Sequence, residues 1–373
     1  MSGVQAPFLS LPQLPRRVTA AREKRGLTQA ALAQKLSFND RQTLAAIEAG
    51  QRRVTAEELL ALMAATGADM EFFTDPFRLV GEGSFSYRAS GFDEKKLDEF
   101  EENARRWIAA WRYLGERKGE KTNALRPRLA IRQGSTFEEA QTAGEEVGRE
   151  LKLGPVPAEK LAAALEEQFG LLVLHVDMPK GISGAACQVG NGEVIFVNRN
   201  EALVRRNFDL AHELFHVLTW DALPPERVDR ENPTSYKQKR VEQLADNFAG
   251  ALLVPTKLLK PMWDRRSARA SLGQWITAAA SHFGVSTAAL RWRLVALNWM
   301  TKVEAEATKD PKKLQAAKTM VPAAFSRRFL ERIAWGIDRG EISARKTAEI
   351  LGVEVSELQP LFAAQGLAVV IGL

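Results

Sequence analysis

The chain has 373 residues, long enough for two or three domains that each bury a hydrophobic core. Its 45% hydrophobic and 26% charged residues are ordinary for a globular protein, and no stretch approaches the ~18 uninterrupted apolar residues of a membrane span. A single cysteine excludes an internal disulfide framework, and the first residues lack a signal-peptide pattern, so we expect a cytoplasmic protein without membrane contact.

The net charge of +6 favours an anionic partner, but the positive charges are unevenly placed. Residues 1–75 contain nine Lys or Arg against eight Asp or Glu, whereas residues 257–318 contain twelve against four. A solvated surface explains the second region as well as nucleic acid does. Charge alone therefore does not locate a nucleic-acid site.

The first part of the chain predicts a small all-α domain. Residues 1–15, with three prolines, predict a disordered leader, and residues 16–80 predict a helix-turn-helix domain. Thr28 and Thr55 precede helical segments as capping residues, and Thr55 forms a capping-box pattern with Glu58. The predicted helices span residues 17–24, 29–36, 41–49 and 56–66. A helix, a short turn and a second helix is the arrangement that places a recognition helix in the major groove.

The segments Gly26–Gln29, Leu32–Ala33 and Ile47–Gly50 resemble the XRE (phage-repressor-like) helix-turn-helix family. The resemblance implies binding to double-stranded operator DNA, with bases read from the start of the third helix. The DNA contacts that it implies are Gln29, Asp40, Arg41, Gln42, Thr43, Arg52 and Arg53. The turn is one residue longer than the family pattern, and the near-neutral charge weakens DNA affinity. A helical domain used for dimerisation or partner contact remains the alternative.

Residues 81–134 predict a helical connector followed by a linker. Apolar residues recur at helical spacing between Leu97 and Leu114 in a strongly charged background, which favours a packing or dimerisation helix. Residues 115–134 carry six Lys or Arg and are typical of a basic linker.

Residues 135–300 predict an α+β domain. Ser135 and Glu138 form a capping-box pattern for a first helix, and a second helix at 158–169 precedes an apolar strand at 171–176. Residues 184–189 and 193–197 predict a hairpin, whose last strand offers an edge for an extended peptide. Residues 301–373 predict a C-terminal helical domain, so the fold class is multidomain and mainly α, with one α+β domain.

The helical run 207–220 contains the pattern His212-Glu213-Leu214-Phe215-His216. Histidines four apart lie one turn above each other on one helix face, where both imidazoles can bind one Zn²⁺. The glutamate between them can accept a proton from water beside the metal. The alternative is a helix with two packed histidines, but two of only four histidines in the chain fall in this frame.

A second helical run supplies a third ligand. Leu244, Phe248 and Leu252 recur every four residues, and Glu242 and Asp246 share another face. Glu242 can complete a His₂Glu zinc set, and Asp246 can accept a hydrogen bond from the far nitrogen of a ligating histidine. A solvated helix with scattered carboxylates is the alternative.

Residues 135–300 resemble the ImmA/IrrE family of metallopeptidases. The segments that carry the resemblance are Gly181–Gly184, Val197–Asn198, Arg206–His216, Glu242–Ala249 and Leu252–Pro255. The resemblance implies that His212, His216 and Glu242 bind zinc and that Glu213 is the general base. Members of this family commonly cleave or control a repressor in stress response or prophage induction, and some fusions to XRE domains belong to toxin–antitoxin or phage-defence loci.

These expectations combine into a homodimeric, DNA-binding transcriptional regulator with a zinc-dependent endopeptidase domain. Its substrate is expected to be a repressor or toxin encoded nearby, and self-cleavage within residues 115–134 is the less favoured route. The alternative is a non-proteolytic repressor or antitoxin in which the metallopeptidase fold is a structural or sensing module. His175 and Cys187 are expected in the core, and Tyr236 is expected in a loop.

Overall fold

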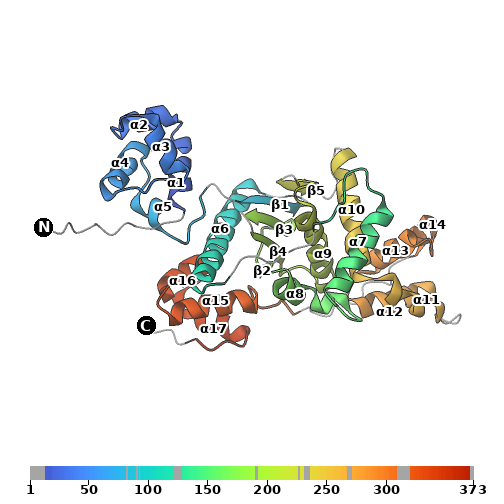
Figure 1. Ribbon diagram of the computed structural model, residues 1–373. Helices are drawn as coiled ribbons and strands as arrows, with labels where there is room; N and C mark the ends of the chain where they lie inside the picture. Colours follow the sequence, from blue (N-terminus) through green and yellow to red (C-terminus); the bar gives the residue numbers. More distant parts are fainter. Residues whose placement is uncertain are drawn as a thin grey trace. The chain divides into compact units, whose positions relative to one another are not determined.

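The computed structural model describes most of the chain, which divides into two compact units. The described residues are 13–80, 83–89, 91, 93–120, 128–189, 192–225, 227–230, 236–266, 271–308 and 320–369. The first unit contains residues 1–82, 102–119 and 349–352, and the second contains the remainder. Within the described residues, no helix is both long and apolar enough to cross a membrane. The chain is mainly helical with one small sheet, as the sequence predicts (Figure 1).

The N-terminal domain consists of five helices, four of which the sequence predicts. They are α1 (Leu14–Lys24), α2 (Gln29–Lys35), α3 (Arg41–Glu48), α4 (Ala56–Thr66) and α5 (Met70–Thr74). Thr28, Asp40 and Thr55 each accept a hydrogen bond from a backbone N–H in the first turn of the helix that follows. The centre of the core is formed by apolar residues that are at most 1% exposed, namely Val18, Leu32, Leu44, Ile47, Leu62 and Phe73. The leader lies outside the described residues except at its end.

Helix α6 (Glu94–Arg117) buries the apolar stripe that the sequence predicts. Leu97, Phe100, Ala104, Trp107, Trp111 and Leu114 are all buried. In the first unit, the Trp107 indole N–H donates to the Ile350 carbonyl at 2.9 Å, and the Phe77 and Tyr113 rings pack edge to face. This face of α6 is therefore covered within the chain itself.

The second unit contains a five-stranded mixed sheet in the order β2-β4-β3-β1-β5 (Figure 1). The strands are β1 (Ser84–Ala89), β2 (Leu172–Val176), β3 (Ile182–Val189), β4 (Gly192–Asn198) and β5 (Val228–Arg230). β3 and β4 form the predicted antiparallel hairpin, and β2 runs parallel to β4. The sequence predicted neither β1, which pairs antiparallel with β3, nor β5, which runs parallel to β1.

This strand order corrects one expectation. β4, the last strand of the predicted hairpin, lies between β2 and β3 and has no free edge for a peptide. Strand alternation separates the two faces of the sheet. Ile195 and Val197 join the main core, whereas Phe196 packs with the ring of Phe100 from α6 on the other face.

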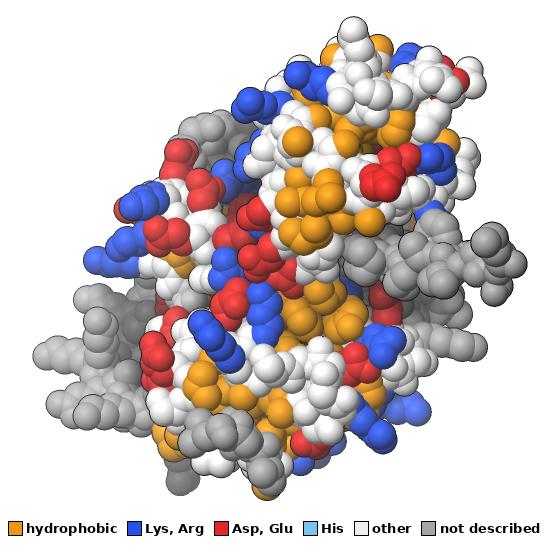
Figure 2. Space-filling view, turned by 90° about the vertical axis from the view of Figure 1, so that its left-hand side faces the viewer, with side chains coloured by type: hydrophobic (Ala, Val, Ile, Leu, Met, Phe, Trp, Pro, Cys, Tyr) orange, Lys and Arg blue, Asp and Glu red, His pale blue; other side chains and the backbone are white. Residues whose placement is uncertain are grey.

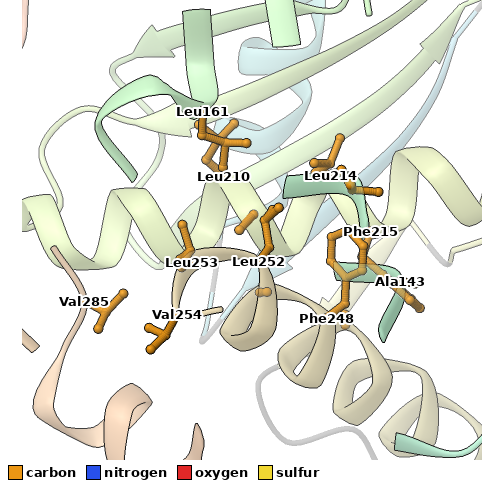
Figure 3. Close-up of a cluster of buried hydrophobic side chains, with 14 of the residues drawn as sticks. Ala143, Leu161, Leu210, Leu214, Phe215, Phe248, Leu252, Leu253, Val254 and Val285 are labelled. Atoms are coloured by element: carbon orange, nitrogen blue, oxygen red, sulfur yellow. The ribbon is translucent and has the colours of Figure 1, made fainter. Parts of the chain in front are cut away.

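Eight helices of the described residues pack around the main core, among them the helix that carries His212 and His216. They are α7 (Phe137–Glu150), α8 (Pro157–Gln168), α9 (Leu203–Thr219), α10 (Tyr236–Leu253), α11 (Thr256–Asp264), α12 (Leu272–Phe283), α13 (Thr287–Ala296) and α14 (Lys302–Ala307). Figure 3 shows Leu214 and Phe215 of α9 near Phe248 of α10 and Ala143 of α7. α7 and α10 approach closely, because a Cβ on Gly144 would lie 2.4 Å from the Phe248 carbonyl oxygen.

The cap of α7 lies one residue later than predicted. The hydroxyl of Thr136, and not that of Ser135, accepts a hydrogen bond from the Glu139 backbone N–H. The Glu139 carboxylate in turn accepts one from the Thr136 backbone N–H. Thr136 has the extended backbone conformation of an N-cap. The Ser135 hydroxyl instead accepts from the Arg132 N–H.

Parts of the predicted linker belong to each of the two units. α6 continues to Arg117 in the first unit, and Ile131 is only 6% exposed in the main core of the second. The Leu129 N–H donates to the Leu218 carbonyl at 3.1 Å, and Arg128 donates to the Val217 carbonyl at 3.1 Å. Residues 121–127 lie outside the described part of the chain. The C-terminal region forms α15 (Arg327–Asp338), α16 (Ala344–Leu351), a 3₁₀ turn (Val355–Glu357) and α17 (Leu358–Ala364).

Candidate metal centre

Helices α9 and α10 carry the metal-binding motif. α9 is amphipathic, and Arg206 at its start donates to the Arg199 carbonyl at 2.8 Å, which fixes the entry into the helix. His212 and His216 lie one turn apart on α9. Glu242 and Asp246 lie one turn apart on α10. The two helices run antiparallel, since the earlier histidine, His212, meets Asp246 and the later one, His216, meets Glu242.

Three side chains converge on one point. The distances are 3.1 Å from His212 Nε2 to Glu242 Oε2, 3.4 Å from His216 Nε2 to Glu242 Oε1, and 3.1 Å between the two Nε2 atoms. Two bonds of ~2.0–2.2 Å at a tetrahedral centre would place their donor atoms about 3.3–3.6 Å apart. Glu242 uses a different oxygen in each of its two distances. One donor atom from each residue forms a triangle whose atoms all lie within 4.8 Å of one another, and the residues therefore fit a bound metal ion.

Asp246 lies behind His212, on the side away from the triangle. Its Oδ1 is 3.0 Å from His212 Nδ1, so the carboxylate orients the ring and directs Nε2 toward the other two donors. His216 Nδ1 is buried and has no hydrogen-bond partner among the described residues. The two histidines therefore differ at Nδ1, which faces a carboxylate in His212 only; the ring of His216 packs edge to face with Phe215.

Glu213 of α9 lies against strand β3. The residue is 1% exposed, and its Oε1 has no hydrogen-bond partner within the described structure. A Cβ on Gly184 of β3 would lie 3.2 Å from both Glu213 Cγ and Oε1, so the glycine leaves room for this carboxyl group. Burial raises the pKa of Glu213 to about 7, although the neighbouring His216 and His212 oppose this shift.

The ligand side chains shift one another's pKa. Burial and the positive charge of Arg88 disfavour the charged form of His212, but the Glu242 and Asp246 carboxylates outweigh both and raise the pKa of His212 to about 10. Burial likewise disfavours ionised Glu242, yet His212 and His216 hold the pKa of Glu242 well below its ordinary value. A metal ion bound here would compete with protons for these donor atoms.

One charged residue near the triangle was missed by sequence reasoning. Arg88 of β1 donates to Asp209 Oδ1 at 3.2 Å and lies 3.7 Å from Asp246 Oδ1. The sequence feature that could have revealed Arg88 is the alternation of aromatic with small or charged residues in Ser84–Ala89. This alternation is typical of a strand, but it extends over only a short segment. Arg88 thus links the sheet to α9 and α10.

Most residues predicted to contact DNA already have partners in their own domain. Gln29 donates to Glu48 at 2.8 Å, and Arg52 makes a two-pronged ion pair with Glu58 at 2.7 and 3.0 Å. Asp40 caps α3 through the backbone N–H and hydroxyl of Thr43.

Four of the predicted DNA-contact residues are exposed, namely Asp40, Arg41, Gln42 and Arg53. On the face shown in Figure 2, the described Lys and Arg side chains are interspersed with Asp and Glu and do not gather into one patch. The structure therefore places Arg41 and Gln42 outward at the start of α3, where the resemblance implies base contacts.

The other residues discussed in the sequence analysis lie outside the metal centre. Cys187 is buried in β3, and His175 in β2 has a pKa that burial lowers to about 4. Tyr236 is 85% exposed at the first residue of α10, so it lies on a helix and not in the expected loop. His282 is exposed on α12.

Comparison with protein families agrees with both parts of this description. No curated protein matches the chain. Residues 18–73 match the helix-turn-helix family model, and residues 166–295 match the model described as the IrrE N-terminal-like domain, a peptidase family. The chain is therefore a fusion of an XRE-type helix-turn-helix domain with an IrrE-like, metallopeptidase-type domain.

Proposed function

We propose that this protein is a DNA-binding transcriptional regulator whose second domain is a zinc-dependent endopeptidase. The observation that carries the proposal is the donor triangle of His212, His216 and Glu242, with Glu213 beside it on the same helix. Two nitrogens and one carboxylate oxygen form a common catalytic zinc set, which leaves a fourth position open.

Each residue of the site has a distinct role in this proposal. Bound zinc would act as a Lewis acid that polarises a peptide carbonyl and makes water nucleophilic near neutral pH. Glu213 accepts a proton from the attacking water, for which its unpartnered Oε1 is available. Asp246 keeps the ring of His212 in the tautomer that presents Nε2 to the metal.

The helix-turn-helix domain supports a regulatory role for the cleavage. Domains of this type bind operator half-sites, and a homodimer on a pseudo-palindrome is the expected arrangement. The substrate is proposed to be a separate regulatory protein, such as a repressor or toxin encoded nearby. Self-cleavage is disfavoured at residues 128–131, because Ile131 is buried and the backbone N–H of Leu129 is bonded to Leu218.

The test combines metal analysis with cleavage assays on the full-length protein. We expect about one zinc per chain in the wild type and in Glu213→Gln, and cleavage of a neighbouring gene product by the wild type alone. The glutamine variant keeps the shape of the side chain but cannot accept the proton. Mass spectrometry of new termini measures the cleavage, and activity that survives in Glu213→Gln would exclude Glu213 as the base.

The burial of the motif is the observation that supports a second candidate function. His212, Glu213 and His216 are each 1% exposed, and a site closed to solvent in this way is typical of a structural or sensing module. In that case the chain is a non-proteolytic repressor or antitoxin. A wild-type protein that retains zinc, cleaves no neighbouring gene product and changes its DNA affinity when zinc is removed would support this second function.

A further inference from the structure

Strand β1 brings a charged side chain to the metal-binding face of the sheet. Directly opposed residues in neighbouring strands point to the same face, and Arg88 pairs with Gly184 of β3. Gly184 faces Glu213 on α9, so Arg88 points to the same side. Phe85 and Tyr87, which alternate with Arg88 along β1, point to the other face, where the ring of Tyr87 packs against that of Phe100 from α6. β1 precedes the segment that matches the IrrE-like model.

The guanidinium of Arg88 lies between two carboxylates from different helices. It donates to Oδ1 of Asp209, whose side chain is 2% exposed on α9, and lies 3.7 Å from Oδ1 of Asp246 on α10. The Asp246 side chain is 48% exposed, so it depends on its partners for a fixed orientation. A planar guanidinium with several N–H donors can engage both groups at once, which an ammonium does less well.

We propose that Arg88 is a positioning residue of the metal centre, acting through Asp246 on His212. The chain of contacts runs from buried Asp209 to Arg88, then to Asp246 Oδ1, and from that same oxygen to His212 Nδ1 at 3.0 Å. The inference rests on metal binding by the proposed function. It assigns part of the metal centre to a strand that the family match does not include.

The positive charge of Arg88 also acts on the metal centre, because it disfavours the positive form of His212 and so opposes the rise in the pKa of that histidine. Arg88 lies against two carboxylates, and the nearer of them is buried. These carboxylates offset part of the repulsion between Arg88 and a metal ion. We expect the orientation of Asp246 to outweigh the remaining repulsion, because ordering a carboxylate behind a ligating histidine strengthens metal binding.

Arg205 provides the matched control. Its Nε lies 3.4 Å from Asp209 Oδ2, so it shares one carboxylate with Arg88. Arg205 and Asp209 lie one turn apart on α9, so their ion pair stays within one helix and does not connect α9 to α10. Replacing Arg205 therefore perturbs Asp209, whereas replacing Arg88 perturbs both carboxylates.

The test measures zinc affinity of the full chain by competition with a chromophoric chelator. Arg88→Gln is expected to bind zinc about 10-fold more weakly, the lower end of the range for groups that orient metal ligands. Arg205→Gln is expected to stay within about 2-fold of the wild type, because Asp246 keeps its partner. The absorption of the cobalt(II)-substituted protein should change in Arg88→Gln and not in Arg205→Gln.

A double-mutant cycle then tests the route through Asp246. In an Asp246→Asn background, Arg88→Gln should cause little further loss of zinc affinity, because the carboxylate that it positions is gone. Equal losses in the two arginine variants, or an undiminished loss in the Asp246→Asn background, would overturn the inference. Tighter zinc binding by Arg88→Gln would also overturn it, because repulsion would then dominate.

The outcome remains separable from the proposed function. A wild-type chain that binds no zinc contradicts the proposed function itself, whereas a zinc-binding wild type with an unchanged Arg88→Gln contradicts only this inference. Arg88→Lys tests folding independently, since it keeps the charge on β1. It should recover part of the zinc affinity, because one ammonium can reach Asp246 but spans the two carboxylates less well.

Discussion

The metal centre and the helix-turn-helix domain differ in how their predicted residues are used. In the metal centre, His212, His216 and Glu242 approach one another to 3.1–3.4 Å from two helices. In the helix-turn-helix domain, four of the seven predicted DNA-contact residues bond within the domain: Gln29, Asp40, Thr43 and Arg52. Chemistry requires side chains to converge, whereas recognition requires them to remain exposed.

The difference has a physical origin in sequence periodicity. Residues four apart on a helix must share a face, so the spacing of the two histidines fixes their geometry. Exposure is not fixed in this way, because capping and ion pairing compete for the same polar residues that would contact DNA. The predictions below test each side of this comparison, beginning with the largest expected effect.

Removing one ligand should empty the metal centre and leave the other domain intact. We expect Glu242→Ala to reduce bound zinc from about one per chain to near background, because two imidazoles alone form an incomplete site. Elemental analysis measures the loss. The control is binding to a DNA duplex selected from a random library by the wild type, which should be unchanged, and full zinc retention would assign the third ligand elsewhere.

The stability of the second unit should depend on the close contact between α7 and α10. Gly144→Ala would place a Cβ 2.4 Å from the Phe248 carbonyl oxygen, so the helices must separate. We expect it to lower the free energy of unfolding by about 1–3 kcal/mol, as overpacking does. Denaturant unfolding measures the change.

Gly250 on α10 is the matched control for this prediction. A Cβ there would meet no atom closer than Arg293 Cδ at 4.0 Å. Gly250→Ala should therefore leave stability unchanged or raise it by up to about 1 kcal/mol, since alanine favours helix. Similar destabilisation by both substitutions would show that helix separation is not the cause.

The extent of sequence prediction follows the same division. The histidine motif could be predicted because its spacing is local. Glu242 could be predicted because it lies in a second helical pattern that pairs with this motif. The β3–β4 hairpin was predicted because its pattern is also local. Strand β1 was not, because its partner β3 lies far along the chain and six residues carry a weak alternation. Arg88 was therefore missed together with its strand.

Two further misses show where local patterns are ambiguous. Ser135 with Glu138 and Thr136 with Glu139 both satisfy the capping-box spacing, and only backbone geometry selects Thr136. Likewise, an isolated sequence cannot show that β4 is covered on both sides, because strand order depends on β1 and β2. Such choices depend on tertiary pairing and not on residue type.

The exposed start of α3 should carry the DNA specificity. Arg41 and Gln42 are exposed there, and a side chain that bonds a base edge contributes about 1–3 kcal/mol of discrimination. We expect alanine at either position to weaken binding to the selected duplex by that amount and to leave non-specific binding almost unchanged. Competition with random DNA measures the ratio, and unchanged specificity in the double variant would place recognition elsewhere.

Arg52 offers the smallest effect and the sharpest distinction between structure and recognition. Its guanidinium pairs with both carboxylate oxygens of Glu58, and Glu58 also accepts from the backbone N–H of Thr55 at the start of α4. The resemblance to the XRE family implies a DNA contact at this position, but the ion pair already occupies the side chain. We expect Arg52→Ala to lower the free energy of unfolding by about 0.5–1 kcal/mol, as for a partly exposed ion pair.

The salt dependence of DNA binding separates the two roles of Arg52. A phosphate contact releases a counterion, so its loss would reduce the slope of log affinity against log salt by about 1. We expect Arg52→Ala to leave this slope unchanged and Arg53→Ala, at the exposed neighbouring position, to reduce it. A reduced slope in Arg52→Ala would mean that DNA displaces Glu58 from Arg52. The capping box of α4 would then change on binding, because Glu58 belongs to both contacts.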